Sequence, residues 1–305
     1  MGKFVLGKMV MAALVAITVS AITFLMLNLA GDPAVTIAGE GASPETIAQI
    51  RAQYGFDQPL VVQYASWLLR AVGGDLGISY YFKVPVGHLI AERIGVTMLL
   101  GLLGITLALL VSLPLGVLAA LKPNSLVDRL SLLLAVIGQA VPSFWLGLLL
   151  IVLFSIKLRW LPASGSSGWA NFVLPAVVLG TYAMPALMRL TRTGMLEVLS
   201  ADYMRTARAK GLSRGRIVFK HALRNAVIPV VSLAAVQMGF MLGGSIVVES
   251  VFAVQGAGLL AWQSIARNDL PTMQALILVF SMFYIVFNLL ADVLNAWLDP
   301  RLRAA

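Results

Sequence analysis

The chain of 305 residues contains no cysteine and only two histidines, His88 and His221. Without thiols it cannot form a disulfide, use a cysteine nucleophile or hold a metal through sulfur. The H-E-x-x-H and G-x-S-x-G motifs are also missing, and no carboxylates are spaced to ligate a metal. We therefore expect a protein that is not an enzyme, with no catalytic residues, no metal site and no cofactor of its own.

Charged residues are scarce as well, at 11%, whereas 60% of the residues are hydrophobic and the mean hydropathy is +0.92. Soluble domains carry about 25% charged residues, so this composition predicts an all-α protein that crosses a lipid bilayer several times. Nine basic and two acidic residues between Arg189 and Arg224 contribute +7 of the net charge of +9. Such a local excess is typical of a cytoplasmic loop, and we expect no nucleic-acid partner.

Apolar runs predict six membrane-spanning helices, because each is long enough to cross a hydrocarbon core of about 30 Å. The first run follows Lys3 and Lys8 and has the form of a signal peptide, but its 22 residues and its poor cleavage site favour a retained helix. The predicted spans are residues 9–30, 95–119, 130–156, 172–190, 227–249 and 273–297.

The distribution of charge predicts the orientation of these spans. Lys3 and Lys8, the loop 121–129 and the large basic loop fall on one side, which we expect to be cytoplasmic together with both termini. The stretch 31–93 has six acidic and four basic residues and falls on the other side. We expect it to be a small extracytoplasmic region with short helices. One of them covers 44–54, with Ser43 as its N-cap and Pro44 in its first turn.

Several polar residues lie in or beside the apolar runs, where they face a bundle interior or an aqueous cavity in membrane proteins. They are therefore candidates for a translocation path, and hydrogen bonding between helices is the alternative interpretation. These candidates are Gln139, Ser143, Gln237, Ser245 and Glu249.

The large basic loop has helical periodicity. A first helix runs from Leu199 to Gly211, where the glycine fits the position after a helix C-terminus, and Ser213 then caps a second helix over 214–228. In that second helix the apolar residues Val218, Phe219, Ala222 and Ala226 are predicted to share one face. Such a helix pair binds lipid headgroups or docks a cytoplasmic partner, and its spacing is compatible with either function.

Residues 202–213, DYMRTARAKGLS, followed by 221–226, HALRNA, resemble the cytoplasmic EAA loop of ATP-binding-cassette (ABC) importer permeases. The resemblance is closest to the first permease of the dipeptide, oligopeptide, glutathione and nickel importers. It continues along nearly the whole chain, although Gln255 and Ala257 replace the Pro and Leu of the family's outer turn. Further matches are 31–33 (GDP), 74–77 (GDLG), 142–147 (PSFWLG), 160–162 (WLP), 243–245 (GGS) with Val248 and Glu249, and 298–301 (LDPR).

This resemblance implies a type I importer permease fold, with an N-terminal helix 1–30, an outer region 31–93, a core 94–298 and a tail 299–305. The loop 191–226 would couple the permease to an ATPase. Implied partners are a second homologous permease in a heterodimer, two cytoplasmic ATPase subunits that use ATP and Mg²⁺, and an extracytoplasmic solute-binding protein. The coupling residues carried over from the motif are Arg205, Ala207, Lys210, Gly211, Leu212 and Ser213.

The resemblance also implies a bacterial inner-membrane protein that imports peptides of the di- or oligopeptide or glutathione type. Nickel chelates and other small solutes are alternative cargoes of the same machinery. A secondary transporter driven by an ion gradient and a non-transporting scaffold are the alternatives from other classes. A secondary transporter would need inverted repeats and ionisable residues at the membrane midplane, and neither is evident.

Overall fold

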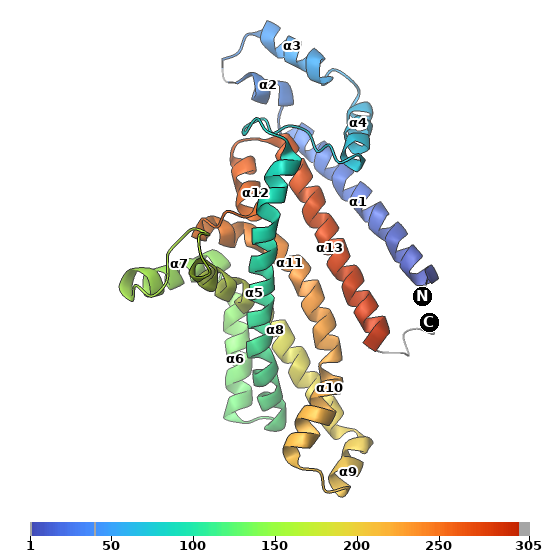
Figure 1. The fold of residues 1–305 in the computed structure, drawn as a ribbon, viewed down its shortest axis with the longest axis vertical. Coiled ribbons are helices and arrows are strands. Elements are labelled where there is room, and N and C mark those ends of the chain that lie inside the picture. Colours follow the sequence, from blue (N-terminus) through green and yellow to red (C-terminus); the bar gives the residue numbers. More distant parts are fainter. Residues whose placement is uncertain (1, 40, 299–305) are drawn as a thin grey trace. The chain divides into compact units, whose positions relative to one another are not determined.

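The computed structural model describes residues 2–39 and 41–298, and it is built almost entirely of helices (Figure 1). The expectation of an all-α fold is therefore confirmed. The chain forms two compact units, the first containing residues 1–97 and 255–285, and the second residues 98–254 and 286–305. The predicted tail 299–305 lies outside the described residues.

The first unit contains short helices between the end of one long helix and the start of another. Helix α3 begins as the sequence predicts, because Ser43 Oγ accepts a hydrogen bond from the Thr46 N–H at 3.2 Å and Pro44 occupies the first turn. The unit contains α1 (Gly2–Ala30), α2 (Pro33–Ala38), α3 (Pro44–Tyr54), α4 (Leu60–Val72) and α12 (Ala257–Ala266), with the first parts of α5 (Val86–Leu121) and α13 (Leu270–Leu298).

The buried carboxylate of Asp269 ties two distant segments of the first unit together. It accepts hydrogen bonds from Ser79 Oγ at 2.5 Å, from the Tyr80 N–H at 2.9 Å and from Thr272 Oγ1 at 2.7 Å. A buried carboxylate needs several donors to offset the loss of its hydration. Asp269 therefore fixes the loop that precedes α5 against the turn between α12 and α13.

The second unit is organised around α8, which packs against α6 and α11. Close helix contact depends on glycine, since a Cβ atom at Gly180 would lie 2.8 Å from the Gly104 carbonyl oxygen of α5. The helices of this unit are α6 (Leu126–Ala140), α7 (Ser143–Leu150), the π-helix η1 (Ile151–Lys157), α8 (Ala170–Ser200), α9 (Asp202–Ala209), the π-helix η2 (Arg216–Ala222), α10 (Leu223–Ala226) and α11 (Ile228–Phe252).

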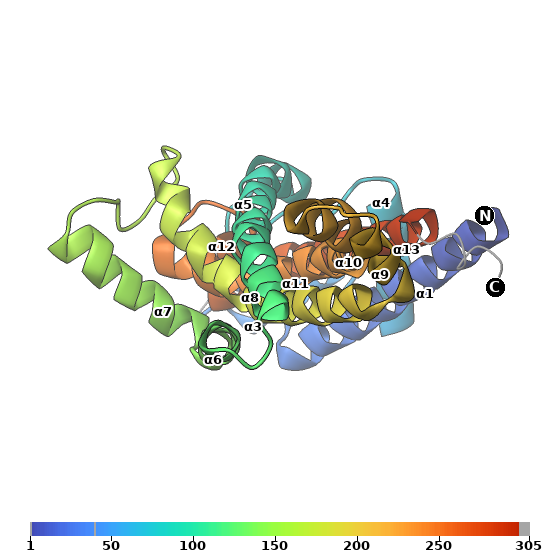
Figure 2. The same cartoon turned by 90° about the horizontal axis from the view of Figure 1, so that it is seen from below.

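The predicted straight helix over 130–156 is wrong. Helix α6 ends at Ala140, and the helix that follows is bent away from it by 102° (Figure 2). Val141 is extended, with φ −79° and ψ 123°, because a residue before proline is disfavoured in the helical region. The break therefore follows from Pro142, whereas Pro114, Pro175 and Pro185 all lie inside continuous helices.

The other five predicted spans correspond to helices long and apolar enough to cross a membrane, and the broken pair makes a sixth if its two helices count as one span. By length and composition, these five are Gly7–Leu29, Val86–Leu121, Ala170–Ser200, Ile228–Phe252 and Leu270–Asn295.

Candidate functional site

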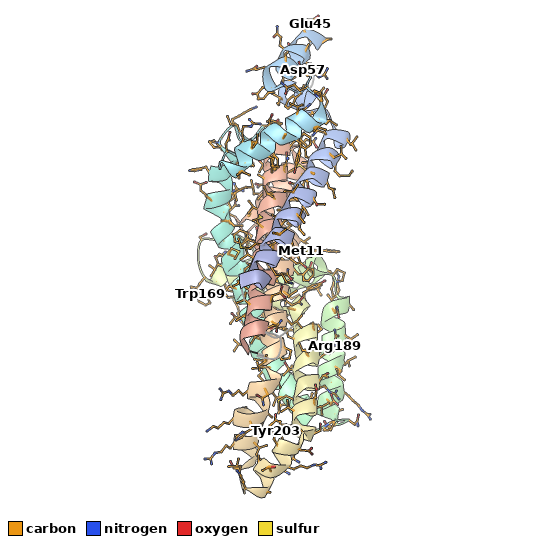
Figure 3. The ribbon with its side chains drawn as sticks, turned by 90° about the vertical axis from the view of Figure 1, so that its right-hand side faces the viewer. Met11, Glu45, Asp57, Trp169, Arg189 and Tyr203 are labelled. Carbon is orange, nitrogen blue, oxygen red and sulfur yellow. The ribbon has the colours of Figure 1, made fainter. Side chains whose placement is uncertain are left out.

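The basic loop folds into a helical hairpin-like projection that we call the coupling element, residues 201–229 (Figure 3, where Tyr203 lies on it). The predicted continuous helix from Leu199 is wrong, because α8 ends at Ser200 and Ala201 is extended, with φ −66° and ψ 148°. Helix α9 then starts at Asp202. The break at Ala201 thus separates the coupling element from the long helix that precedes it.

Gly211 ends α9 as predicted. Its φ of +72° lies in the left-handed region, its N–H donates to the Arg208 carbonyl at 3.0 Å, and the Leu212 N–H donates to the Ala207 carbonyl at 3.4 Å. This pair of bonds is a Schellman motif, which satisfies the last carbonyls of a helix. A Cβ atom at Gly211 would meet nothing within 4 Å, so the position requires glycine for its backbone conformation and not for space.

The second helix of the coupling element begins at Arg214, and the Ile217 N–H donates to the Ser213 carbonyl at 3.0 Å. Its first part continues as the π-helix η2, and the cap by the Ser213 side chain stays a prediction. The wider π turn shifts the register of the side chains. Phe219 is 68% exposed whereas Val218, Ala222 and Ala226 are buried, so the prediction that these four residues share one face is wrong for Phe219.

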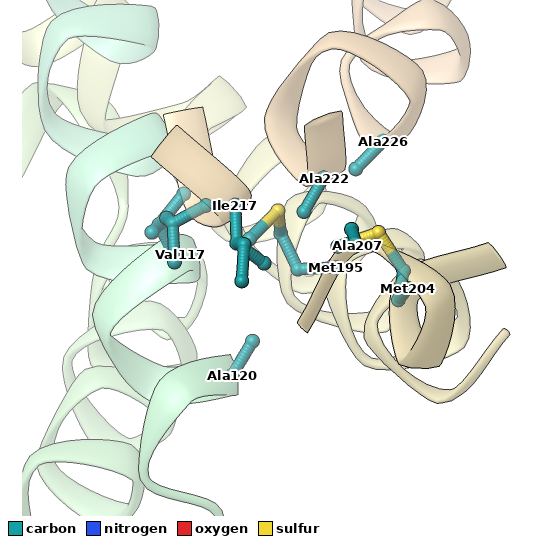
Figure 4. Packing of buried hydrophobic residues seen from close by; sticks show 9 residues of the cluster. Val117, Ala120, Met195, Met204, Ala207, Ile217, Ala222 and Ala226 are labelled. Carbon is teal, nitrogen blue, oxygen red and sulfur yellow. The ribbon is translucent and has the colours of Figure 1, made fainter. Parts of the chain in front are cut away.

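A hydrophobic cluster joins the coupling element to the long helices of the second unit (Figure 4). It draws two residues from α5, one from α8, two from α9, three from η2 and one from α10. All nine residues are almost completely buried, and a close-packed interior resists compression. The cluster therefore packs the coupling element directly against the ends of α5 and α8. The cluster consists of Val117, Ala120, Met195, Met204, Ala207, Ile217, Val218, Ala222 and Ala226.

The structure divides the six predicted coupling residues between this cluster and the surface. Ala207 is buried in the cluster and Leu212 packs against it, so these two residues anchor the turn at the tip. The remaining four are exposed: Arg205, Lys210, Gly211 and Ser213. The tip Lys210–Ser213 thus consists of three exposed residues and of Leu212, which packs against the cluster.

Hydrogen bonds between side chains and to the backbone also hold the helices of the coupling element together. Asn225 Nδ2 donates to the Tyr203 hydroxyl at 2.9 Å, which joins α10 to α9, and Arg208 Nη2 donates to the Leu199 carbonyl at 3.2 Å. The ion pair of Arg205 with Asp202, at 3.6 Å, is almost fully exposed and contributes little to stability.

An ion pair that we did not single out in the sequence holds α6 against α8. Arg192 binds Asp128 through two hydrogen bonds of 2.6 and 2.7 Å, and Asp128 is only 2% exposed. The Asn124 N–H also donates to this carboxylate at 2.9 Å, and Ser125 Oγ caps the helix by accepting from the Asp128 N–H. The S-x-x-D pattern at 125–128 is a capping signal that identifies the position of Asp128 but not its partner.

The five candidates for the translocation path have different environments. Ser245 and Glu249 lie one turn apart on the buried face of α11, where Ser245 Oγ donates to the Leu242 carbonyl at 2.7 Å. Gln237 on the same helix and Ser143 at the start of α7 are half-buried, and Gln139 near the end of α6 is exposed.

Residues 112–304 match the family of binding-protein-dependent transport system inner membrane components, and residues 1–101 match the N-terminal part described for such components. The chain belongs to this family. It is 45% identical to the glutathione transport system permease protein GsiC of Escherichia coli K12 over 286 residues, which cover 93% of this chain and 94% of that protein. It is also 40% identical to a putative peptide transport system permease protein of Brucella abortus, with 99% of both chains covered.

The fold is also similar to a solved structure, an inward-facing conformation of the MetNI methionine ABC transporter. The TM-score is 0.59 at 18% identity, and the match covers 69% of this chain and 96% of the other. This family member is accordingly a multi-pass inner-membrane permease subunit of an ABC importer.

Proposed function

We propose that this permease imports short peptides, of the di- or oligopeptide or glutathione type. The observation that carries the proposal is the near-complete coverage of two relatives whose names specify glutathione and peptide transport, at 45% and 40% identity. Nickel chelates and other small solutes remain the alternative cargo of the same machinery.

Energy comes from separate subunits in this proposal. Two cytoplasmic ATPases use ATP and Mg²⁺, while this chain performs no chemistry and binds no cofactor. The exposed tip Lys210–Ser213, with Arg205, contacts an ATPase. Ala207 and Leu212 pass the movement of the tip to the hydrophobic cluster, and the cluster passes it to α5 and α8. Support for this route comes from the packing of the cluster, because a packed interior switches between discrete arrangements and does not deform gradually.

The remaining partners follow from the same proposal. A second homologous permease forms a heterodimer with this chain, and a solute-binding protein delivers cargo to the outer side. The termini and the loop 191–226 face the cytoplasm, the region 31–93 faces outward, and the core 94–298 contains the path. Residues proposed to contribute to that path are Gln139, Ser143, Gln237, Ser245 and Glu249.

Reconstitution tests the energy source and the cargo together. Proteoliposomes would contain this chain, its second permease and the binding protein, with or without the ATPases, and uptake of labelled glutathione and of a labelled dipeptide would be measured. We expect uptake only with ATPases and ATP. Uptake driven by an ion gradient without ATPases would identify a secondary transporter. ATP-driven uptake of a nickel chelate, but of neither peptide, would establish the alternative cargo.

A further inference from the structure

The first unit contains a pocket of about 460 Å³. None of the residues that line it belongs to the coupling element. The end of α1, helix α4, the loop before α5 and the start of α13 surround it, and all these segments belong to the same unit. Aromatic rings and polar side chains line it together, which is typical of a site that orients a small molecule.

Two of the residues that line this pocket carry a buried hydrogen-bond donor. Trp67 and Gln274 are each only 7% exposed, and within the described part of the chain neither Trp67 Nε1 nor Gln274 Nε2 has a hydrogen-bond partner. Buried polar groups almost always have a partner, and an unpaired one costs free energy. A ligand oxygen in the pocket would supply the acceptor that both donors lack.

The charged side chains that line the pocket indicate which charges a ligand would carry. Arg70 and Lys83 supply two cations, and Asp75 supplies a carboxylate whose Oδ1 also accepts from the Gly77 N–H at 2.9 Å. Burial, with smaller contributions from Tyr54 and Asp269, raises the pKa of the Tyr80 phenol well above its usual value, so Tyr80 stays a neutral O–H group. A wall with both signs of charge suits a molecule that carries an ammonium and a carboxylate.

Neighbouring contacts hold the two donors in place. The Tyr64 hydroxyl bonds Ser20 Oγ at 2.8 Å and fixes α4 to α1 one turn before Trp67. Asp269 binds Ser79 and Thr272 and so fixes the start of α13, where Gln274 lies. Donors that are fixed before a ligand arrives lose little entropy when it binds.

We propose that this pocket binds a zwitterion of amino-acid to short-peptide size, whose carboxylate accepts from Trp67 and Gln274 and whose ammonium lies near Asp75. The inference rests on the proposed function, because the ligand would be peptide cargo held on the permease itself. A phospholipid headgroup with an ammonium and a phosphate shares this chemistry, and the experiment separates it from a peptide.

The test measures binding of the dipeptide Ala-Phe to the purified full-length chain by the ligand-induced shift of its thermal unfolding and by calorimetry. Removing one donor with Trp67→Phe or Gln274→Leu should weaken binding about tenfold, because a hydrogen bond to a charged group is lost. The unliganded variants should unfold at the same temperature as the wild type or higher, since an unpaired donor is removed. Amidating the carboxylate of Ala-Phe should weaken binding to the wild type by a similar factor.

Trp160→Phe and Gln49→Leu are matched controls, because both residues are exposed and neither lines the pocket. They should bind Ala-Phe as the wild type does. Equal binding by Trp67→Phe, Gln274→Leu and the wild type would overturn the proposal. So would a phospholipid that mass spectrometry finds retained by the wild type, lost from both variants and not displaced by Ala-Phe.

Uptake in the reconstituted transporter distinguishes a failure of this binding site from a failure of the proposed function. ATP-driven dipeptide uptake with no Ala-Phe binding at the pocket would overturn this inference and leave the proposed function standing. Binding that depends on Trp67 and Gln274, in a transporter that moves no peptide, would overturn the proposed cargo and leave the zwitterion site standing.

Discussion

At the scale of single residues, the ion pair of Asp128 and Arg192 shows that the packing of two helices depends on a contact between distant parts of the chain. Arg192 presents two donors to a carboxylate that is almost completely buried at the first turn of α6. Bidentate geometry makes such a pair strong and directional. It fixes α6 to α8, the helix that leads into the coupling element.

Replacing Asp128 by asparagine should therefore destabilise the protein strongly. Removing one partner of a buried ion pair leaves the other charge without compensation, and we expect a loss of about 3 kcal/mol in the free energy of unfolding. Chemical denaturation in detergent measures this free energy. The matched control is Asp202→Asn, whose partner Arg205 is exposed, and this change should leave stability nearly unaltered. Equal stability of the two variants would show that the buried pair is not structural.

Residue-scale predictions succeed where the cause is local. Gly211 is recognisable because a helix stop needs a left-handed residue, and the structure places it there with φ +72°. Ser43 is also recognisable, because an N-cap serine accepts a hydrogen bond from a backbone N–H in the first turn of the same helix. Asp269 is not, because its donor Ser79 lies 190 residues away in the sequence. That Trp67 and Gln274 line the same pocket is equally invisible to local reasoning, since they lie far apart in the sequence.

At the scale of elements, the hydrophobic cluster decides whether the coupling element is a rigid body or a loose loop. Met204 is fully buried in the cluster, whereas Phe219, on the neighbouring η2, is 68% exposed. Periodicity alone predicts Phe219 on the same face as Val218, Ala222 and Ala226, because an ordinary helical period cannot anticipate a π-helical stretch. The stretch from Arg216 to Ala222 is where the assumption of a uniform helix fails.

Met204→Ala should loosen the coupling element without unfolding the rest of the second unit. A cavity left by a buried methionine costs about 2–5 kcal/mol, and the cost falls on the segment that depends on the cluster. Amide hydrogen exchange should speed up across α9 and η2 by at least tenfold. Phe219→Ala is the control and should leave exchange unchanged, since its side chain is mostly in solvent. Equal exchange in both variants would contradict the packing described here.

The long helices are more predictable than their interruptions. Five of the six predicted spans correspond to continuous helices. A run of about 20 mostly apolar residues predicts a helix, because in a bilayer the backbone must satisfy its own hydrogen bonds. The sixth span breaks at Pro142 and bends by 102°, which composition does not indicate. The break at Ala201 differs from the break at Pro142, because no proline or glycine marks it in the sequence.

At the scale of the whole molecule, the orientation in the membrane is the feature on which the proposed function depends. Charge asymmetry predicts the coupling element inside and the region 31–93 outside. The chain contains no cysteine, so a single introduced cysteine is the only thiol that a reagent can label.

Labelling of single cysteines with a membrane-impermeant maleimide tests this orientation. Ser213→Cys should react only from the cytoplasmic side and Gln49→Cys only from the outer side, because both positions are exposed on opposite sides of the predicted topology. The wild-type protein is the blank and should not react. Labelling of Ser213→Cys from outside would reverse the orientation and remove the basis for docking an ATPase.

The most direct measurement of the central claim, that the tip Lys210–Ser213 passes ATP-driven motion to the membrane helices, uses two substitutions of Gly211. Valine strains a left-handed position by about 1–2 kcal/mol, whereas asparagine tolerates it, and a Cβ atom at Gly211 meets nothing within 4 Å. In proteoliposomes with the complete transporter, Gly211→Val should lower ATP-driven uptake about five- to thirtyfold with membrane insertion unchanged, and Gly211→Asn should retain most of it. Wild-type uptake by Gly211→Val, in a protein that is correctly inserted, would contradict the claim.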